Sequence, residues 1–303
     1  MKRDFLRLWD LSSGEILLLL KRAIELKSGK DANKCPLMGK SIGLLFEKVS
    51  TRTRVSFEVG IYQLGAHATY MNPNEIQLGR GETIHDTARV LSRYLDAIVI
   101  RTFSHNSLID FASSSSVPVI NGLSDLHHPC QALADLMTIH EKKGKLKGIR
   151  LSYIGDGNNV ANSLIEAASR MGIHITLACP KGYEPAPHLL KEAKASAKSE
   201  IKIIRDPKEA ADKADVLYTD VWVSMGQEKE AREKKEKLRG YQLNSRILSC
   251  ANKDAIVLHC LPAHRGEEIT DDVMDGPQSA VFDQAENRLH TQKALLEFLL
   301  TPI

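Results

Sequence analysis

The chain has 303 residues, which is more than one hydrophobic core usually organises, so two domains are predicted. Hydrophobic residues make up 43% of the chain and charged residues 26%, as in ordinary globular proteins. The net charge of +3 is too small to indicate nucleic-acid binding through bulk charge.

We expect a cytoplasmic protein. The first ten residues include acidic side chains and no long apolar run, and the apolar run 16–20 is too short to cross a membrane. The cysteines contain no Cys-x-x-Cys pair, so neither a disulfide framework nor a zinc ribbon is expected. The five are Cys35, Cys130, Cys179, Cys250 and Cys260.

Strands and helices are predicted to alternate along the first half of the chain, which indicates an α/β domain with a parallel sheet over residues 1–140. Strands are predicted at 42–46, 67–71, 96–100 and 117–120. Helices are predicted at 12–27, from Ser50 to Leu64, and at 82–94, 107–116 and 130–141.

A basic, glycine-containing stretch at 142–147 separates a second alternating series, which predicts another α/β domain over residues 141–286. Residues 227–240 are mostly charged and indicate a solvated helix or a mobile loop. Strands are predicted at 149–154, 173–178, 201–204, 216–219, 255–259 and 280–282. Helices are predicted at 160–171, 188–199, 207–213 and 241–250, with a last one at 287–300 that packs back on the first domain.

Ser50-Thr51-Arg52-Thr53-Arg54 lies where the first strand gives way to a helix. The start of a helix has free backbone N–H groups and the positive end of the dipole, so it favours an anion. Arginine adds paired donors that fit phosphate or carboxylate oxygens. The stretch therefore predicts a phosphate site, with a well-capped helix carrying surface arginines as the alternative.

Two further groups of candidate residues follow strands of the first domain. Arg101 stands at the carboxyl end of its strand, where open α/β sheets place their ligands. His128 and Gln131 lie three residues apart at the start of a helix and share one helix face. Structural roles at the surface or in the core are the alternatives for each of these residues.

Gly155-Asp156-Gly157-Asn158-Asn159 ends a strand and opens a helix, as a dinucleotide-binding loop does. A nicotinamide site also requires an acidic residue at the end of the next strand, and 177–181 contains none. The sequence therefore disfavours a dehydrogenase. The asparagine amides suit a carboxylate or an ammonium group, or they simply cap the helix.

Polar residues also follow the later strands. Asp220, ahead of Ser224 and Met225, offers a carboxylate for an ammonium group on a flexible loop. Cys260 raises the question of a thiol nucleophile, but His259 is its neighbour in an extended segment and points to the other face. Arg288 is a further candidate contact for an anion or a carbonyl.

Together, Ser50-Thr-Arg-Thr-Arg54, His128-Pro-Cys-Gln131, Asp220-Val-Trp-Val-Ser-Met-Gly226 and His259-Cys-Leu-Pro262 resemble the ornithine branch of the carbamoyltransferase family over essentially the whole chain. The resemblance implies two α/β domains, a homotrimer with shared active sites, and no metal or organic cofactor. It implies transfer of a carbamoyl group from carbamoyl phosphate to ornithine, as in arginine biosynthesis, although the direction of the reaction in the cell stays open.

The resemblance also implies two sets of site residues. Carbamoyl phosphate would contact Ser50, Thr51, Arg52, Thr53, Arg101, His128, Gln131, Cys260, Leu261 and Arg288, with Gln77 reaching into the adjacent subunit's site. Ornithine would contact Asn159, Asp220, Ser224 and Met225.

The expected catalytic roles follow from the chemistry of the transfer. The deprotonated δ-amine attacks the carbamoyl carbon, an oxyanion forms, and phosphate leaves. Arg52, Arg101, His128 and Arg288 would stabilise the negative charge, Asp220 would hold the substrate ammonium group, and Cys260 would orient the amine. A carbamoyltransferase for aspartate, putrescine or acylated ornithine, and a non-catalytic anion-binding protein, are the alternatives.

Overall fold

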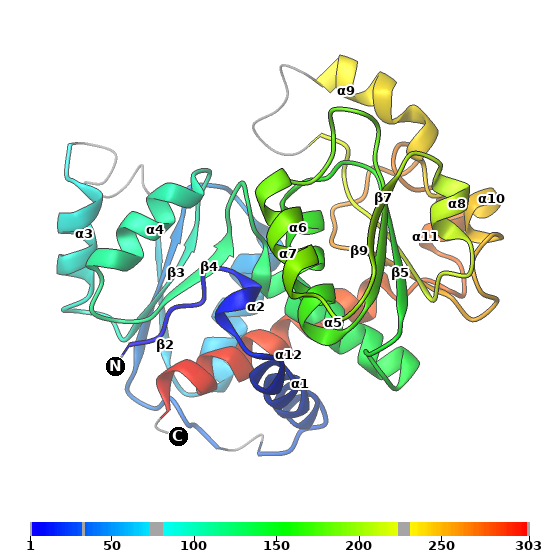
Figure 1. Cartoon of the computed structure of the whole chain (residues 1–303). Helices are drawn as coiled ribbons and strands as arrows, with labels where there is room; N and C mark the ends of the chain where they lie inside the picture. Colours follow the sequence, from blue (N-terminus) through cyan, green and yellow to red (C-terminus); the bar gives the residue numbers. More distant parts are fainter. Residues whose placement is uncertain (1, 32–33, 73–80, 224–230, 302–303) are drawn as a thin grey trace. The chain divides into compact units, whose positions relative to one another are not determined.

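A computed structural model describes residues 2–31, 34–72, 81–223 and 231–301 (Figure 1). The chain divides into two compact units. The first contains the residues up to Met137 and those from Glu286 onwards, and the second is Thr138–Ala285. Gln77, Ser224 and Met225 lie outside the described residues.

The first unit is built on a four-stranded parallel sheet in the order β2-β1-β3-β4. The strands are β1 (Ser41–Phe46), β2 (His67–Met71), β3 (Ala97–Arg101) and β4 (Val119–Leu123). Its helices are α1 (Ser13–Lys27), α2 (Thr51–Gln63), α3 (Ile84–Leu91) and α4 (His105–Ser114), together with parts of α5 (Pro129–Lys143) and α12 (Val281–Leu300).

The second unit is built on a five-stranded parallel sheet in the order β7-β6-β5-β8-β9. The strands are β5 (Arg150–Ile154), β6 (His174–Ala178), β7 (Ile201–Ile204), β8 (Val216–Thr219) and β9 (Ile256–His259). Its helices are α6 (Asn159–Met171), α7 (Pro187–Ser196), α8 (Pro207–Ala211), α9 (Ala231–Leu238), α10 (Ser245–Leu248) and α11 (Asp271–Met274). The predicted fold class of two parallel sheets flanked by helices is confirmed.

Local sequence signals explain where these elements begin. Ser12 caps α1, because its hydroxyl accepts the backbone N–H of Glu15 while the Glu15 carboxylate accepts the backbone N–H of Ser12. Strand β3 is buried along its whole length, as expected for a central strand of a parallel sheet that is covered on both faces.

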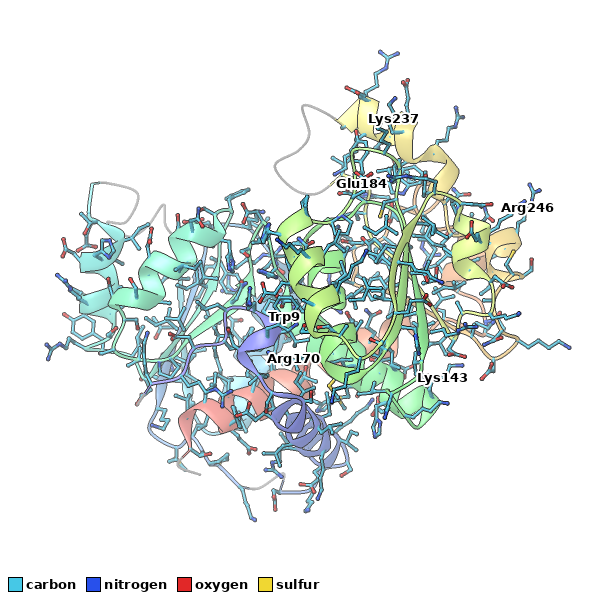
Figure 2. All side chains as sticks on the ribbon, viewed as in Figure 1. Trp9, Lys143, Arg170, Glu184, Lys237 and Arg246 are labelled. Carbon is cyan, nitrogen blue, oxygen red and sulfur yellow. The ribbon has the colours of Figure 1, made fainter. Side chains whose placement is uncertain are left out.

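Side chains fill the interior of each unit, while Lys237 on α9 and Arg246 on α10 extend from the surface of the second unit (Figure 2). Among the helices of the described ranges, none is both long and apolar enough to cross a membrane.

The predicted strand at 280–282 is wrong. Helix α12 begins at Val281, and only Ser279 forms an isolated bridge, to Val257. A short apolar run such as Ala280-Val281-Phe282 does not distinguish a strand from the first turn of a buried helix. The charged stretch at 227–240 contains α9, in which Lys234 and Leu238 are buried.

Both sheets change winding direction once. In the first unit the chain runs from β1 outwards to β2 and then returns to place β3 on the other side of β1. In the second unit it runs from β5 through β6 to β7 and returns to place β8 beside β5. Parallel α/β sheets bind ligands at the carboxyl ends of the strands at such switch points. The topology therefore predicts one ligand-binding position in each unit, at the carboxyl ends of β1 and β3 in the first and of β5 and β8 in the second.

Gly157 is required by close packing within the second unit. A Cβ atom on this residue would lie 2.3 Å from the backbone nitrogen of Pro185. We expect Gly157→Ala to lower the free energy of unfolding by about 1–3 kcal/mol, because the segment around Pro185 must shift. Gly240 is the matched control, since nothing lies within 4 Å of its added Cβ. Urea denaturation of the two variants tests this, and equal stabilities would contradict it.

Candidate active site

The start of α2 forms the centre of a polar cluster in the first unit. Ser50 is the N-cap, and its hydroxyl accepts the backbone N–H of Thr53 at 3.2 Å. Thr51 is exposed, whereas Thr53 is buried and accepts a hydrogen bond from Arg288 at 2.8 Å through its hydroxyl. The helix start is therefore joined to α12 by a buried side-chain bond.

Arg288 also joins α12 to α5. Its second guanidinium nitrogen donates to the Gln131 side-chain oxygen at 2.9 Å, and the Gln131 amide donates to Asp135 at 2.8 Å. All three side chains are buried. The structure thus brings together the predicted residues Thr53, Gln131 and Arg288.

His128 lies in the positive field of three arginines. Complete burial lowers the pKa of its imidazole well below the usual value, and the charges of Arg288, Arg101 and Arg52 lower it further. The imidazole is therefore neutral at physiological pH and can donate or accept a hydrogen bond without adding charge. Three guanidiniums acting on one buried imidazole, with Arg52 itself partly exposed, make this cluster suited to a multivalent anion.

Arg54 does not belong to this cluster. Its guanidinium donates to Glu58 at 2.9 Å and lies 3.7 Å from the centre of the Tyr70 ring. Of the two arginines in the motif, only Arg52 acts on His128. The spacing along a helix explains the difference, because residues two apart face different directions.

A second polar cluster lies in the second unit, at the switch point between β5 and β8. Asp220 directly follows β8 and is buried. One of its oxygens accepts the Asn158 amide at 2.7 Å and the other accepts the Cys260 thiol at 2.9 Å. Because Thr219 pairs with His259 across the sheet, the next residues of the two strands, Asp220 and Cys260, are adjacent.

Asn158 belongs to the asparagine pair for which the sequence left two roles open, contact with a charged group or a helix cap. It performs both roles, since its side-chain oxygen accepts the backbone N–H groups of Val160 and Ala161 while its amide nitrogen reaches Asp220. The predicted contact Asn159 is the first residue of α6. The strand-end position of the asparagine pair was the available signal, but it did not indicate which of the two faces Asp220.

Lys234 compensates a second buried carboxylate close to Asp220. Its ammonium group lies 2.6 Å from Asp156, and both side chains are almost completely buried. Burial raises the pKa of Asp156 and the charge of Asp220 raises it further, whereas Lys234 lowers it. A charged stretch read along the chain does not show that one of its lysines has a buried partner.

His259 does not activate the Cys260 thiol. Its Nδ1 atom accepts the backbone N–H of Leu261 at 2.9 Å, so Nε2 carries the hydrogen and donates to Glu268 at 3.2 Å. Both ring nitrogens are therefore engaged elsewhere. A ring nitrogen of His259 nonetheless lies within 4.8 Å of the Cys260 sulfur, so the expectation that His259 points to the other face is not confirmed. Leu261 adopts a positive φ of 59°, a strained conformation that its bond to His259 holds in place.

Two groups in the described part of the chain have the spacing of metal ligands. The first is Asp220, His259 and Cys260, and the second is His264, Glu267 and Glu268. In the first group the Asp220 oxygens already accept the Asn158 and Cys260 donors, so a metal ion would have to displace these bonds. The glycine at 157 is likewise explained by the chain's own Pro185 and does not require a dinucleotide.

Comparison with known proteins adds independent findings. Residues 3–141 match the domain described as aspartate/ornithine carbamoyltransferase, carbamoyl-P binding domain. Residues 147–299 match the Asp/Orn binding domain of the same family.

Ornithine carbamoyltransferases are among the most similar relatives. The one from Syntrophus aciditrophicus is 54% identical over 99% of this chain and 100% of its own length. The one from Anoxybacillus flavithermus is 55% identical over 98% and 96% of the two chains. Among solved structures, the ornithine carbamoyltransferase from Pyrococcus furiosus has a TM-score of 0.95 at 50% identity, covering 100% of this chain and 98% of that one.

The neutral state of His128 leads to a pH-dependent stability. Because its pKa is lowered in the folded state, the unfolded chain binds more protons than the folded one below the ordinary histidine pKa of about 6.5. We therefore expect the free energy of unfolding contributed by this residue to be retained above that pH and to fall by about 1–2 kcal/mol between pH 7 and pH 5. Urea denaturation of the native protein and of His128→Asn measures the difference, and identical pH slopes would contradict the assignment.

Proposed function

The chain belongs to the aspartate/ornithine carbamoyltransferase family, and we propose that it transfers the carbamoyl group of carbamoyl phosphate to the δ-amine of ornithine. The products are citrulline and phosphate, as in a step of arginine biosynthesis. The observation that carries the choice of second substrate is the buried Asp220 carboxylate, held by Asn158 and Cys260. A carboxylate favours the ammonium group of ornithine and repels a dicarboxylate such as aspartate.

We assign carbamoyl phosphate to the first unit. Its charge is matched by Arg52, Arg101 and Arg288, whose charges all act on the neutral His128. The start of α2 adds free backbone N–H groups beside the Ser50 cap, and these favour phosphate oxygens. As the tetrahedral intermediate forms and phosphate leaves, the guanidiniums stabilise the negative charge, while neutral His128 hydrogen-bonds the carbamoyl oxygen.

We assign ornithine to the second unit. Asp220 binds the substrate ammonium group, and Lys234 neutralises Asp156 so that Asp220 is the carboxylate left to meet the substrate. The Cys260 thiol, already directed at Asp220, orients the amine that attacks. No covalent thiol intermediate is part of this proposal, because His259 uses both ring nitrogens elsewhere.

The proposed function predicts that substitutions in the first unit lower the rate of citrulline formation, whereas substitutions in the second unit weaken the binding of ornithine. Arg52→Gly should reduce citrulline formation by about 10³-fold or more, because a charge that stabilises the transition state is lost. Asp220→Asn should mainly raise the KM for ornithine. Arg54→Gly is the matched control and should retain turnover, since Arg54 is bound to Glu58 and Tyr70.

The assay gives the purified protein carbamoyl phosphate with ornithine, aspartate, putrescine or acetylornithine in parallel. Turnover with ornithine alone is expected. Turnover with another amine would retain the phosphate site and overturn the role given to Asp220. A folded native protein that binds carbamoyl phosphate without turnover of any amine would favour a binding function.

We further propose a homotrimer in the cytoplasm, in which Gln77 of one subunit reaches the site of the next. An exposed apolar stripe on α2 supports association of this kind. Val55, Val59 and Tyr62 recur at helical spacing, and 49%, 38% and 81% of their surfaces are exposed. A cytoplasmic location is supported by the five cysteines, which all lie in the described ranges and form no disulfide there.

The α2 stripe provides a test of the assembly. The combined change Val55→Glu and Tyr62→Glu should lower the mass measured by light scattering from that of three chains, because it places charges in an apolar interface. Ile109→Glu is the control, since Ile109 is also exposed but lies on α4. A native protein with the mass of one chain, or a double variant that keeps the mass of three, would contradict the assembly.

A further inference from the structure

Three side chains that commonly bind metal ions gather in the segment that follows β9, outside the clusters described above. His264, Glu267 and Glu268 each offer one ligand atom, and these atoms all lie within 4.8 Å of one another. All three residues belong to the second unit. None of them is given a contact with either substrate in the proposed function.

Hydrogen bonds hold this segment in a tight turn. The backbone N–H of Glu267 donates to the His264 carbonyl at 2.8 Å, and that of Gly266 donates to the Ile269 carbonyl at 2.8 Å. From outside the turn, the Gln242 amide donates to the carbonyls of Gly266 and Glu267 at 2.8 and 2.9 Å. The chain itself therefore sets where the three side chains begin, as a preorganised ligand site requires.

Glu268 is completely buried, and only one of its carboxylate oxygens accepts hydrogen bonds. Oε1 accepts Nε2–H of His259 at 3.2 Å and the backbone N–H of His264. Oε2 is also buried but accepts no hydrogen bond from the described residues. It faces Nδ1 of His264 at 3.9 Å, which is too far for a hydrogen bond. A buried carboxylate oxygen without a donor is costly, so this atom calls for a ligand.

Glu267 repeats the pattern. Its Oε1 atom lies 2.5 Å from the Lys235 ammonium group on α9. Its Oε2 atom is buried and has no hydrogen-bond partner in the ranges that the structure describes. In each carboxylate, then, a protein donor orients one oxygen while the other has no donor. Carboxylate ligands in metal sites are oriented by outer hydrogen bonds in this way.

The distances and the ligand types favour zinc. Two zinc–ligand bonds placed end to end span about 4.2 Å, so one ion can contact both His264 Nδ1 and Glu268 Oε2 across their separation of 3.9 Å. The His264 side chain is 51% exposed, which lets an ion enter and the imidazole turn towards it. Calcium and magnesium prefer sites made of oxygen alone, whereas zinc accepts imidazole nitrogen with carboxylate oxygens.

We propose that His264, Glu267 and Glu268 bind a zinc ion, with water completing its coordination. This inference goes beyond the proposed function and does not depend on it. The ion has a structural role, because Glu268 also accepts the hydrogen bond of His259, whose Nδ1 atom holds the backbone of Leu261. Bound zinc therefore stabilises the segment from the end of β9 to the turn.

The test uses the full chain with the substitution Cys260→Ser. This change removes the thiol from the other group with metal-ligand spacing, which is Asp220, His259 and Cys260. Zinc chloride is titrated into the protein at pH 7.5 and followed by calorimetry, with magnesium chloride as the comparison. We expect one zinc ion per chain at this site and no binding of magnesium. Saturating zinc should also raise the Tm, because the site exists only in the folded chain.

Two further substitutions in this background should change the zinc affinity in opposite directions. His264→Ala removes a ligand and should weaken binding by more than about tenfold, since the loss of an outer-shell partner alone has an effect of that size. Lys235→Gln keeps a hydrogen-bond donor for Glu267 and removes a positive charge close to the ion. It should tighten binding by about threefold.

Glu286→Gln is the matched control. Glu286 lies four residues from His290, the same spacing as His264 and Glu268, and its carboxylate is 3.6 Å from the His290 ring nitrogen. That pair belongs to the first unit and is not part of a group of three ligands among the described residues. Its substitution should leave the zinc affinity unchanged.

The outcomes decide the proposal without an assay of citrulline formation. Absence of zinc binding by folded Cys260→Ser, or equal affinity after His264→Ala, would overturn the site. Weaker binding after Lys235→Gln would overturn the place of Glu267 in it. Thermal melting shows whether each variant is folded. Should Cys260→Ser not fold, the native chain becomes the background, and should His264→Ala not fold, Glu267→Gln replaces it with the same expected loss of affinity.

Discussion

The Arg288 guanidinium joins three segments of the first unit that lie far apart in the sequence. It donates to Thr53 on α2 and to Gln131 on α5, which are 235 and 157 positions away from it. All of these groups are buried, so removing the guanidinium would leave two polar side chains without this partner in a low-dielectric interior. The proposed phosphate site therefore depends on the last helix of the chain being in place.

The same arrangement concentrates positive charge. Arg52, Arg101 and Arg288 all lower the pKa of His128. Like charges at a buried site repel one another and lose hydration, which costs folding free energy. Such an arrangement is stabilised by an anion that accepts several hydrogen bonds at once, and carbamoyl phosphate in the proposed function supplies one. Neutral His128 fits this balance, since a fourth cation would increase the repulsion.

Much of this could be predicted from the sequence, because parallel sheets place functional residues at the carboxyl ends of strands. Ser50 lies at the predicted junction between a strand and a helix and caps α2, and Arg101 ends β3 as its position after an apolar run indicated. The two-sheet fold followed from the alternation of strand and helix patterns. These features depend on local spacing, which a single sequence displays directly.

The remaining features depend on tertiary contacts. The role of Asn158 towards Asp220 required knowing that β5 and β8 are neighbours, which is a property of strand order. Lys234 belongs to a stretch that reads as solvated, yet its ammonium group is buried against Asp156.

The candidate sites of the two units carry opposite local charge. This difference follows from which of the buried charged side chains in each unit have a partner of opposite charge. In the first unit three cations act on a neutral imidazole. In the second unit Asp156 is compensated by Lys234, whereas Asp220 accepts hydrogen bonds from the neutral donors Asn158 and Cys260. Neutral donors stabilise a carboxylate without cancelling its charge, so Asp220 keeps its attraction for a cation. A transfer between a phosphate-bearing donor and an ammonium-bearing acceptor requires this division, because one site of uniform charge would bind only one of the two substrates well.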